Sequence, residues 1–294
     1  MSNKAIVSAS NWFERFTKGW SALSLSLVTS AVMAGGTLIA AWLLRLYHNK
    51  TIGFDRNEMD TKPFEMKPYQ VHIFLGTGNT SWPKKFEHSD IGSRAQDVLA
   101  SLPKSVPKCK ISACDAPIGT VLVFPDRVMY DLSHEPTSNE LSAILKSHLL
   151  KDIQNTTCRE DNKISVNDLG QKPVATDYVM ICGHASRDSR CGYCGPKLAT
   201  EFIKQRKKAT NFDVYQCSHL GGHHFAGNVI IFNESGGHWL GYVRPSDVPK
   251  LISIYLNGSS KNSEQRTPRW RGAIGATKDE MQRERESCGA ILDW

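Results

Sequence analysis

The sequence has little of what marks the commonest ligand-binding classes. The 36 Lys and Arg residues and 29 Asp and Glu residues leave a modest net charge of +7. The basic clusters at 204–208 and 266–285 are not interleaved with aromatic residues in the way that points to nucleic acid, so no nucleic-acid partner is predicted. We interpret them as solvated helical faces, with docking of an acidic partner as the alternative.

Other fingerprints are missing as well. Gly76-Thr77-Gly78 begins like a dinucleotide-binding loop, but position 81 is serine, so GxGxxG is absent. No internal sequence repeat is evident. The 8 cysteines are unevenly spaced, which favours a reducing compartment and cluster chemistry over a secreted disulfide framework.

What the sequence does have is a dense group of cysteines and histidines. CGHASRDSRCGYCGP begins at Cys182 and contains Cys191, and CSHLGGHHFAGNVIIF contains His219 and His223. Two thiolates and two imidazoles in one stretch are typical of a metal site. Because isolated cysteines and histidines are usually packed core residues, the prediction depends on all four occurring together.

The local pattern places these residues at the ends of elements. The apolar run 178–181 predicts a strand that ends at Cys182. Pro196 suits the first turn of a helix, so Cys191 is expected just before a helix N-terminus, where backbone N–H groups favour an anionic thiolate. Gly221 and Gly222 predict that the HxxxH segment is a loop rather than a helix.

Three interpretations of the cysteines compete. Cys191-Gly-Tyr-Cys194 is a CxxC before a helix, as in thioredoxin-type disulfide enzymes. A structural zinc ion accepts two cysteines and two histidines, but the spacing from Cys182 to Cys191 does not fit the short pairs of zinc fingers. An iron-sulfur cluster suits the longer spacing better.

The motifs CGHxxRDxRCG and SHxGGHxFAGNVIIF closely resemble the sucrase/ferredoxin-like family of thioredoxin-like ferredoxins. The resemblance runs from about Val71 to the C-terminus. It implies a thioredoxin-like fold and a 2Fe-2S cluster in a Rieske-like ligand set of Cys182, Cys191, His219 and His223. Cys194 and Cys217 are additional thiols nearby, which leaves open whether one of them binds or forms a disulfide. His184 and His224 are expected to be polar loop residues, with a hydrogen bond to the site or replacement of a ligand as the alternative.

Such a ligand set has chemical consequences. Two histidines in place of two cysteines on one iron raise the reduction potential above that of an all-cysteine ferredoxin. His219 and His223 can also couple electron transfer to proton uptake. Arg187, Asp188 and Arg190 lie between the cysteines, where they either tune the cluster or form a local ion pair that shapes the loop.

The N-terminal region predicts a membrane anchor. Residues 19–44 carry no charge and are flanked by basic residues on both sides, a length that spans a bilayer. A buried core helix is the alternative. Flanking charge does not decide the orientation.

The expected architecture is α/β: a thioredoxin-like ferredoxin domain preceded by a smaller α/β half and a single transmembrane helix. The expected segments are an N-terminal stretch (1–18), the anchor (19–46), a polar linker (47–69), a degenerate thioredoxin-like region (70–172), the 2Fe-2S domain (173–260) and a tail (261–294). Strands are predicted at 71–75 and 120–124 and around Val179, Val214, Val229 and Leu240, with helices at 93–102, at 139–153 and after Pro245.

The last residues, Leu292, Asp293 and Trp294, resemble the short C-terminal signal that recruits client proteins to the cytosolic iron-sulfur assembly machinery. This predicts a single-pass membrane protein whose cluster domain faces the cytosol, with the mitochondrial inner membrane as the alternative location. The expected function is one-electron transfer or redox sensing with a redox partner that the sequence does not name. The alternatives are a thiol-disulfide oxidoreductase using Cys191 and Cys194, and an accessory iron-sulfur subunit of a respiratory or other membrane complex.

Overall fold

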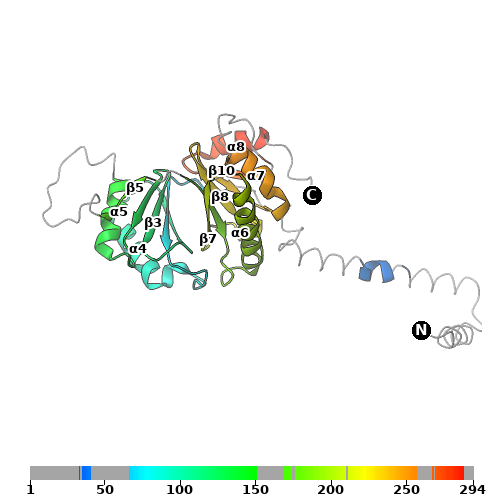
Figure 1. Cartoon of the computed structure of the whole chain (residues 1–294), viewed down its shortest axis with the longest axis horizontal. Helices are drawn as coiled ribbons and strands as arrows, with labels where there is room; N and C mark the ends of the chain where they lie inside the picture. The colour runs from blue at the N-terminus through cyan, green and yellow to red at the C-terminus, as the bar shows by residue number, and fades with distance from the viewer. Residues whose placement is uncertain are drawn as a thin grey trace, which may run out of the picture. The chain divides into compact units, whose positions relative to one another are not determined.

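The computed structural model describes residues 33, 35–40, 66–150, 169–173, 176–209, 211–256, 267 and 269–287. The chain divides into two compact units, Met1–Thr51 and Ile52–Trp294, which are described separately. In the first unit, residues 33 and 35–40 are helical. The second unit contains a mixed α/β fold (Figure 1), and all further elements belong to it.

The N-terminal half of the second unit spans 66–173. Its strands are β1 (Val71–Gly76), β2 (Cys109–Cys114), β3 (Thr120–Phe124), β4 (Val128–Asp131) and β5 (Lys172–Pro173). Its helices are the short 3-10 turn η1 (Phe86–His88), α4 (Asp90–Ser101) and α5 (Ser138–Leu149). Every residue of β1 and β3 is buried, as expected for continuous apolar runs covered on both faces.

The C-terminal half spans 176–287. Its strands are β6 (Asp177–Cys182), β7 (Phe212–Cys217), β8 (Val229–Asn233), β9 (Gly236–Leu240) and β10 (Trp270–Ala273). Its helices are α6 (Ser189–Ala209), α7 (Val248–Tyr255) and α8 (Lys278–Ser287), with 3-10 turns η3 (His223–Phe225) and η4 (Pro245–Asp247). Pro245 precedes the helix after β9, as its fixed φ favours.

One ten-stranded sheet runs through both halves in the order β10-β9-β8-β6-β7-β2-β1-β3-β4-β5. In the N-terminal half, β1 is parallel to β2 and antiparallel to β3. In the C-terminal half, β6 is parallel to β7 and antiparallel to β8. The two halves therefore repeat one connectivity, and they join where β2 pairs with β7 at Cys114 and Cys217.

The two faces of the N-terminal half have different cores. Ile73 and Val123 face a cluster that contains residues of α4 and α5. Phe74 and Phe124 face the larger cluster that includes the C-terminal half, where the Phe124 ring stacks on Phe232 with centroids 3.7 Å apart. The halves are thus held together by ring packing as well as by the strand junction.

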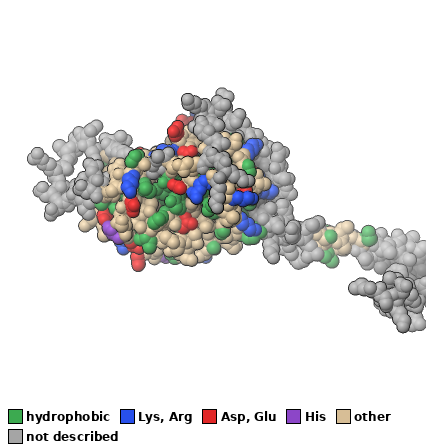
Figure 2. Space-filling model, in the orientation of Figure 1, with side chains coloured by type: hydrophobic (Ala, Val, Ile, Leu, Met, Phe, Trp, Pro, Cys, Tyr) green, Lys and Arg blue, Asp and Glu red, His purple; other side chains and the backbone are tan. Residues whose placement is uncertain are grey.

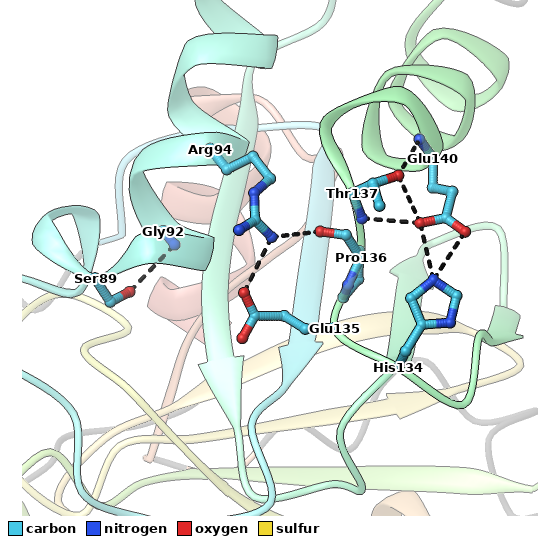
Figure 3. A network of polar contacts seen from close by, with 8 residues as sticks. All are labelled: Ser89, Gly92, Arg94, His134, Glu135, Pro136, Thr137 and Glu140. Carbon is cyan, nitrogen blue, oxygen red and sulfur yellow. Dashed lines mark hydrogen bonds and ion pairs between the residues drawn. The ribbon is translucent and has the colours of Figure 1, made fainter.

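Polar caps fix the two helices of the N-terminal half (Figure 3). The Ser89 hydroxyl accepts a hydrogen bond from the Gly92 N–H at 3.1 Å. At the start of α5, Thr137 and Glu140 form a capping box, with Thr137 N–H donating to Glu140 Oε2 at 2.8 Å and Glu140 N–H to Thr137 Oγ1 at 3.3 Å. Arg94 of α4 donates to the Pro136 carbonyl at 2.6 Å, which links the two helices.

Most of the predicted elements are present, and the mixed α/β class with a large sheet is confirmed. The structure differs at the expected linker and tail. Met66 and Tyr69, placed in the linker, are 5% and 3% exposed and belong to the core. The expected tail contains β10 and α8, and β10 extends the sheet beside β9.

The expected single-pass membrane topology has to be corrected. Within the described residues, no helix combines the length and the apolar character that crossing a membrane requires. This contradicts the predicted localisation, which we withdraw. Most of the expected anchor at 19–46 lies outside the described residues, as do Leu292, Asp293 and Trp294, whose role in recruitment stays a prediction.

Acidic and basic side chains are interspersed on the visible face of the second unit (Figure 2).

Candidate functional site

Cys182 is the last residue of β6, a strand in the middle of the sheet. Its side chain is 1% exposed, and its N–H donates to the Asn228 carbonyl at 3.0 Å. The apolar residues before Cys182 keep the strand buried, and the thiol therefore lies at the point where the strand ends. The predicted position of Cys182 is confirmed.

Cys191 lies in the first turn of α6, which begins at Ser189 rather than near Pro196. Asp188 stabilises this earlier start, because its Oδ1 accepts from the Arg190 N–H at 3.0 Å. A Cβ atom at Gly195 would lie 2.6 Å from the Cys182 carbonyl oxygen. The absence of a side chain there lets α6 approach the end of β6 and bring the two cysteines together.

The two thiols share one hydrogen bond and have opposite pKa shifts. The hydrogen bond from Cys191 lowers the pKa of Cys182 well below its ordinary value, against the effect of burial. The His219 side chain and the N–H groups of Leu220 and His184 lower it further. The same contact and burial raise the pKa of Cys191. Cys182 therefore has the lower pKa of the pair, and its sulfur accepts hydrogen bonds from several donors.

His219 and His223 lie on the loop between β7 and β8, as predicted, and His223 begins the turn η3. Their ring centroids are 5.7 Å apart. Gly222 has a φ of +67°, and a Cβ atom there would lie 2.5 Å from Arg271 Nη2. The glycine is therefore needed both for the left-handed turn and for the close contact.

The histidine pair includes a polar atom with no protein partner. His219 Nδ1 is buried and has no hydrogen-bond partner, which is costly unless a further group binds there. Burial, and then the neighbouring His224, lower the pKa of His223, which favours the neutral imidazole. A neutral ring nitrogen is the form that binds a metal.

His184 supports the site in a way that the sequence did not predict. Its Nδ1 accepts from the His219 N–H at 2.9 Å, and its Nε2 hydrogen-bonds the Pro83 carbonyl at 2.9 Å. Both ring nitrogens are occupied, so His184 positions His219 and is not a further ligand. The Trp82 ring lies edge-on to the His184 ring, with centroids 5.8 Å apart, and the Trp82 carbonyl accepts a hydrogen bond from Ser186 Oγ at 2.6 Å.

The charged residues between the cysteines form a local pair. Arg190 donates from Nε to Asp188 Oδ1 and from Nη2 to Asp188 Oδ2, each at 2.9 Å. Arg187 donates to the Lys84 carbonyl at 3.4 Å. The interpretation of Asp188 and Arg190 as an ion pair that shapes the loop is supported.

The additional cysteines form no disulfide. The same holds for six cysteines in the described part of the chain: Cys109, Cys114, Cys182, Cys191, Cys194 and Cys217. Burial raises the pKa of Cys194 to about 11, and burial also raises that of Cys217. These two thiols are poor nucleophiles in this structure.

The candidate ligands lie as two pairs rather than as one group of four. Among the described residues, no three His, Cys, Asp or Glu side chains are arranged to hold a single metal ion. Cys182 and Cys191 form one pair, and His219 and His223 form the other. The His219 side chain links them through its hydrogen bond to Cys182.

Relatives of the chain are found among yeast proteins named "Altered inheritance of mitochondria protein 32". The protein from Meyerozyma guilliermondii is 27% identical over 231 residues, covering 71% of this chain and 82% of that protein. The protein from Debaryomyces hansenii is 37% identical over 97 residues, 32% of this chain and 36% of that protein. The one from Clavispora lusitaniae is 40% identical over 84 residues, 28% and 31% of the two chains.

A thioredoxin-like [2Fe-2S] ferredoxin from Aquifex aeolicus is a structural match with 15% identity, covering 28% of this chain and 88% of that one. Its TM-score is 0.25, and no conclusion is based on it. A family model described as "Sucrase/ferredoxin-like" matches residues 63–272, which include strands β1 to β9, most of β10 and all four candidate ligands. The chain therefore belongs to the sucrase/ferredoxin-like family.

Proposed function

We propose that this chain carries single electrons, or senses redox state, with a 2Fe-2S cluster held by Cys182, Cys191, His219 and His223. The observation that carries the proposal is the buried His219 Nδ1, which has no protein partner and lies beside a second histidine. A 2Fe-2S cluster of the Rieske type takes two cysteines on one iron and two histidines on the other. The two pairs match that division.

The residues around the ligands fit this role. N–H groups of Leu220 and His184 and the His219 side chain surround the Cys182 sulfur, and hydrogen bonds to a thiolate ligand tune its electron donation. The His184 ring also fixes the backbone of His219 by accepting its N–H. When bound, the cluster supplies a one-electron couple of higher potential than an all-cysteine ferredoxin.

The chemistry of the thiols argues against the disulfide enzyme. A thioredoxin-type nucleophile needs an accessible cysteine with a lowered pKa. Cys191 is 0% exposed and Cys194 is 8% exposed, and the pKa of each is raised. The lowered pKa belongs to Cys182, which lies outside the CxxC and next to the histidine loop.

Anaerobic purification of the full chain tests the proposal. The expected protein is coloured, contains two irons and two sulfides per chain, and gives an EPR signal of one unpaired electron after reduction. A colourless, iron-free protein that stays EPR-silent after reconstitution with iron and sulfide contradicts it.

A further inference from the structure

Lys110 connects the N-terminal half to the histidine loop. It lies in β2, and its Nζ donates to the Leu220 carbonyl at 3.3 Å. A Cβ atom built at Gly221 would lie 3.7 Å from the same Nζ. The ammonium group therefore sits against the segment that joins His219 to His223, although it comes from a strand that contributes no ligand.

Aromatic rings hold this ammonium group in place. Nζ lies 4.6 Å from the centroid of Tyr69 and 4.7 Å from that of Trp239. The Trp239 Nε1–H donates to the Tyr69 hydroxyl at 2.8 Å, which fixes the two rings against each other. The faces of aromatic rings attract a cation without neutralising its charge.

The surroundings of Lys110 keep its charge effective. Within the described residues, Lys110 forms no ion pair with a carboxylate. The guanidinium of Arg271, which is buried, also lies over the Trp239 ring, at 5.5 Å. Lys110 itself is partly buried, and burial and the cations Arg271 and Lys67 lower its pKa to about 8. A charge in such a place acts over a longer distance than one in water.

We propose that Lys110 is a positioning and electrostatic residue that raises the reduction potential of the site, an inference that rests on the proposed function. Reduction adds one negative charge to the bound group, and a fixed, partly buried cation nearby stabilises the reduced form more than the oxidised form. Lys110 also holds the Leu220 carbonyl, while the N–H of Leu220 faces the Cys182 sulfur. The N-terminal half thus acts on the site through a charge.

The test compares three variants of the full chain reconstituted with iron and sulfide. Lys110→Gln keeps a hydrogen-bond donor and removes the charge, Lys110→Arg keeps the charge, and Lys108→Gln is the matched control at an exposed lysine just before the same strand. The midpoint potential is measured by spectroelectrochemistry, together with iron content, the EPR spectrum and the thermal unfolding of the iron-free proteins.

We expect Lys110→Gln to lower the equilibrium constant for reduction about tenfold, which is about 59 mV for a one-electron couple. Lys110→Arg and Lys108→Gln should stay near the wild type. The shift should persist in about 1 M salt, where the screening length is about 3 Å, since salt screens buried charges much less than surface charges.

The outcomes separate the two proposals. If the wild type binds a cluster but Lys110→Gln and Lys108→Gln have equal midpoint potentials, the inference about Lys110 is overturned. The proposed function then still stands. The inference is also overturned if Lys110→Gln binds no iron and Lys110→Arg has a lowered reduction potential. In that case the charge at position 110 does not set the potential. A wild-type protein that binds no cluster removes both.

Discussion

The two halves of the folded unit repeat one connectivity, but only one half carries the candidate ligands. In each half, a central strand is parallel to one neighbour and antiparallel to the next. β1 ends at Gly76, which is in register with Cys114 of β2. β6 ends at Cys182, which is in register with Cys217 of β7. Gly76 and Cys182 therefore occupy equivalent positions, and only the second position has a thiol. The surroundings of the two positions have to explain why one half can accommodate a thiol there.

Loop length accounts for the difference. In the N-terminal half, residues 115–119 connect β2 to β3, and a Cβ atom at Gly76 would lie 2.2 Å from the Pro117 carbonyl oxygen. In the C-terminal half, the longer connection 218–228 takes the equivalent place and carries both histidines. The short loop closes over the strand end, whereas the long loop leaves room for the thiol of Cys182 and carries the two candidate histidine ligands.

The N-terminal half supports the site instead of duplicating it. The Pro83 carbonyl holds His184, and Lys110 holds the Leu220 carbonyl. The Ala113 N–H donates to Ser218 Oγ at 2.9 Å, next to His219. The C-terminal half carries the candidate ligands, and the N-terminal half holds the backbone beside them.

The largest expected effect comes from removing a thiol at the strand end. Cys182→Ser should abolish cluster binding, because it removes the thiolate that the surrounding donors stabilise. Cys114→Ala removes the thiol at the end of β2, in register with Gly76, and should keep the iron and cost about 1 kcal/mol or less in folding stability for the small cavity. Iron and sulfide analysis of both proteins is the measurement. If Cys182→Ser kept as much iron as Cys114→Ala, Cys182 would be removed from the ligand set.

Exchanging the histidines for thiols should change the site without emptying it. His219→Cys and His223→Cys should keep a cluster but lower its reduction potential and weaken the pH dependence of that potential. Protein-film voltammetry across pH measures both quantities. Unchanged electrochemistry in either variant would remove that histidine from the ligand set.

A smaller effect is expected from removing His184, which connects the Pro83 carbonyl of the N-terminal half to the His219 backbone. His184→Ala leaves the His219 N–H without its acceptor, which costs about 1–3 kcal/mol if that group stays buried. The variant should fold with a lower melting temperature and lose cluster faster than the wild type. Ser147→Ala on α5, whose hydroxyl donates to the Ile144 carbonyl, is the control. Identical rates of cluster loss in the His184 variant and the control would contradict the support role.

The smallest effect is expected at the cap of α5 (Figure 3). Burial acts to raise the pKa of Glu140, but the hydrogen bonds from Thr137 and the contact with His134 outweigh it, so the pKa falls below the ordinary 4.5. The carboxylate therefore stabilises the fold above that value, and this contribution is lost as the pH falls below it. Glu140→Gln should remove less than about 1 kcal/mol at neutral pH and flatten the acid limb of the stability curve. Denaturant unfolding from pH 3 to 7 measures this, and a wild-type acid limb in the variant would contradict it. The reduction potential of the site should not change.

The outcome for individual residues shows which signals a sequence carries. The strand before Cys182 and the loop at Gly221 were predictable, because apolar runs and paired glycines act on the chain within a few residues. Pro196 predicts a helix that starts later than α6 does. The helix begins at Ser189 because Asp188 accepts a capping hydrogen bond from the Arg190 N–H.

The support of the site was not predictable in the same way. His184 and Lys110 act through contacts with Pro83 and Leu220, which are far from them in sequence and become neighbours only when β2 pairs with β7. No periodicity or spacing records such contacts. Tyr69 looked like linker for the same reason, since its partner Trp239 lies in the other half.

The most direct test of the central claim is pulsed EPR on the reduced full chain labelled with ¹⁵N-histidine. The account predicts hyperfine coupling of the unpaired electron to two histidine nitrogens, and to one after His223→Cys. A cluster signal without histidine coupling would contradict the assignment of His219 and His223, and with it the difference between the two halves.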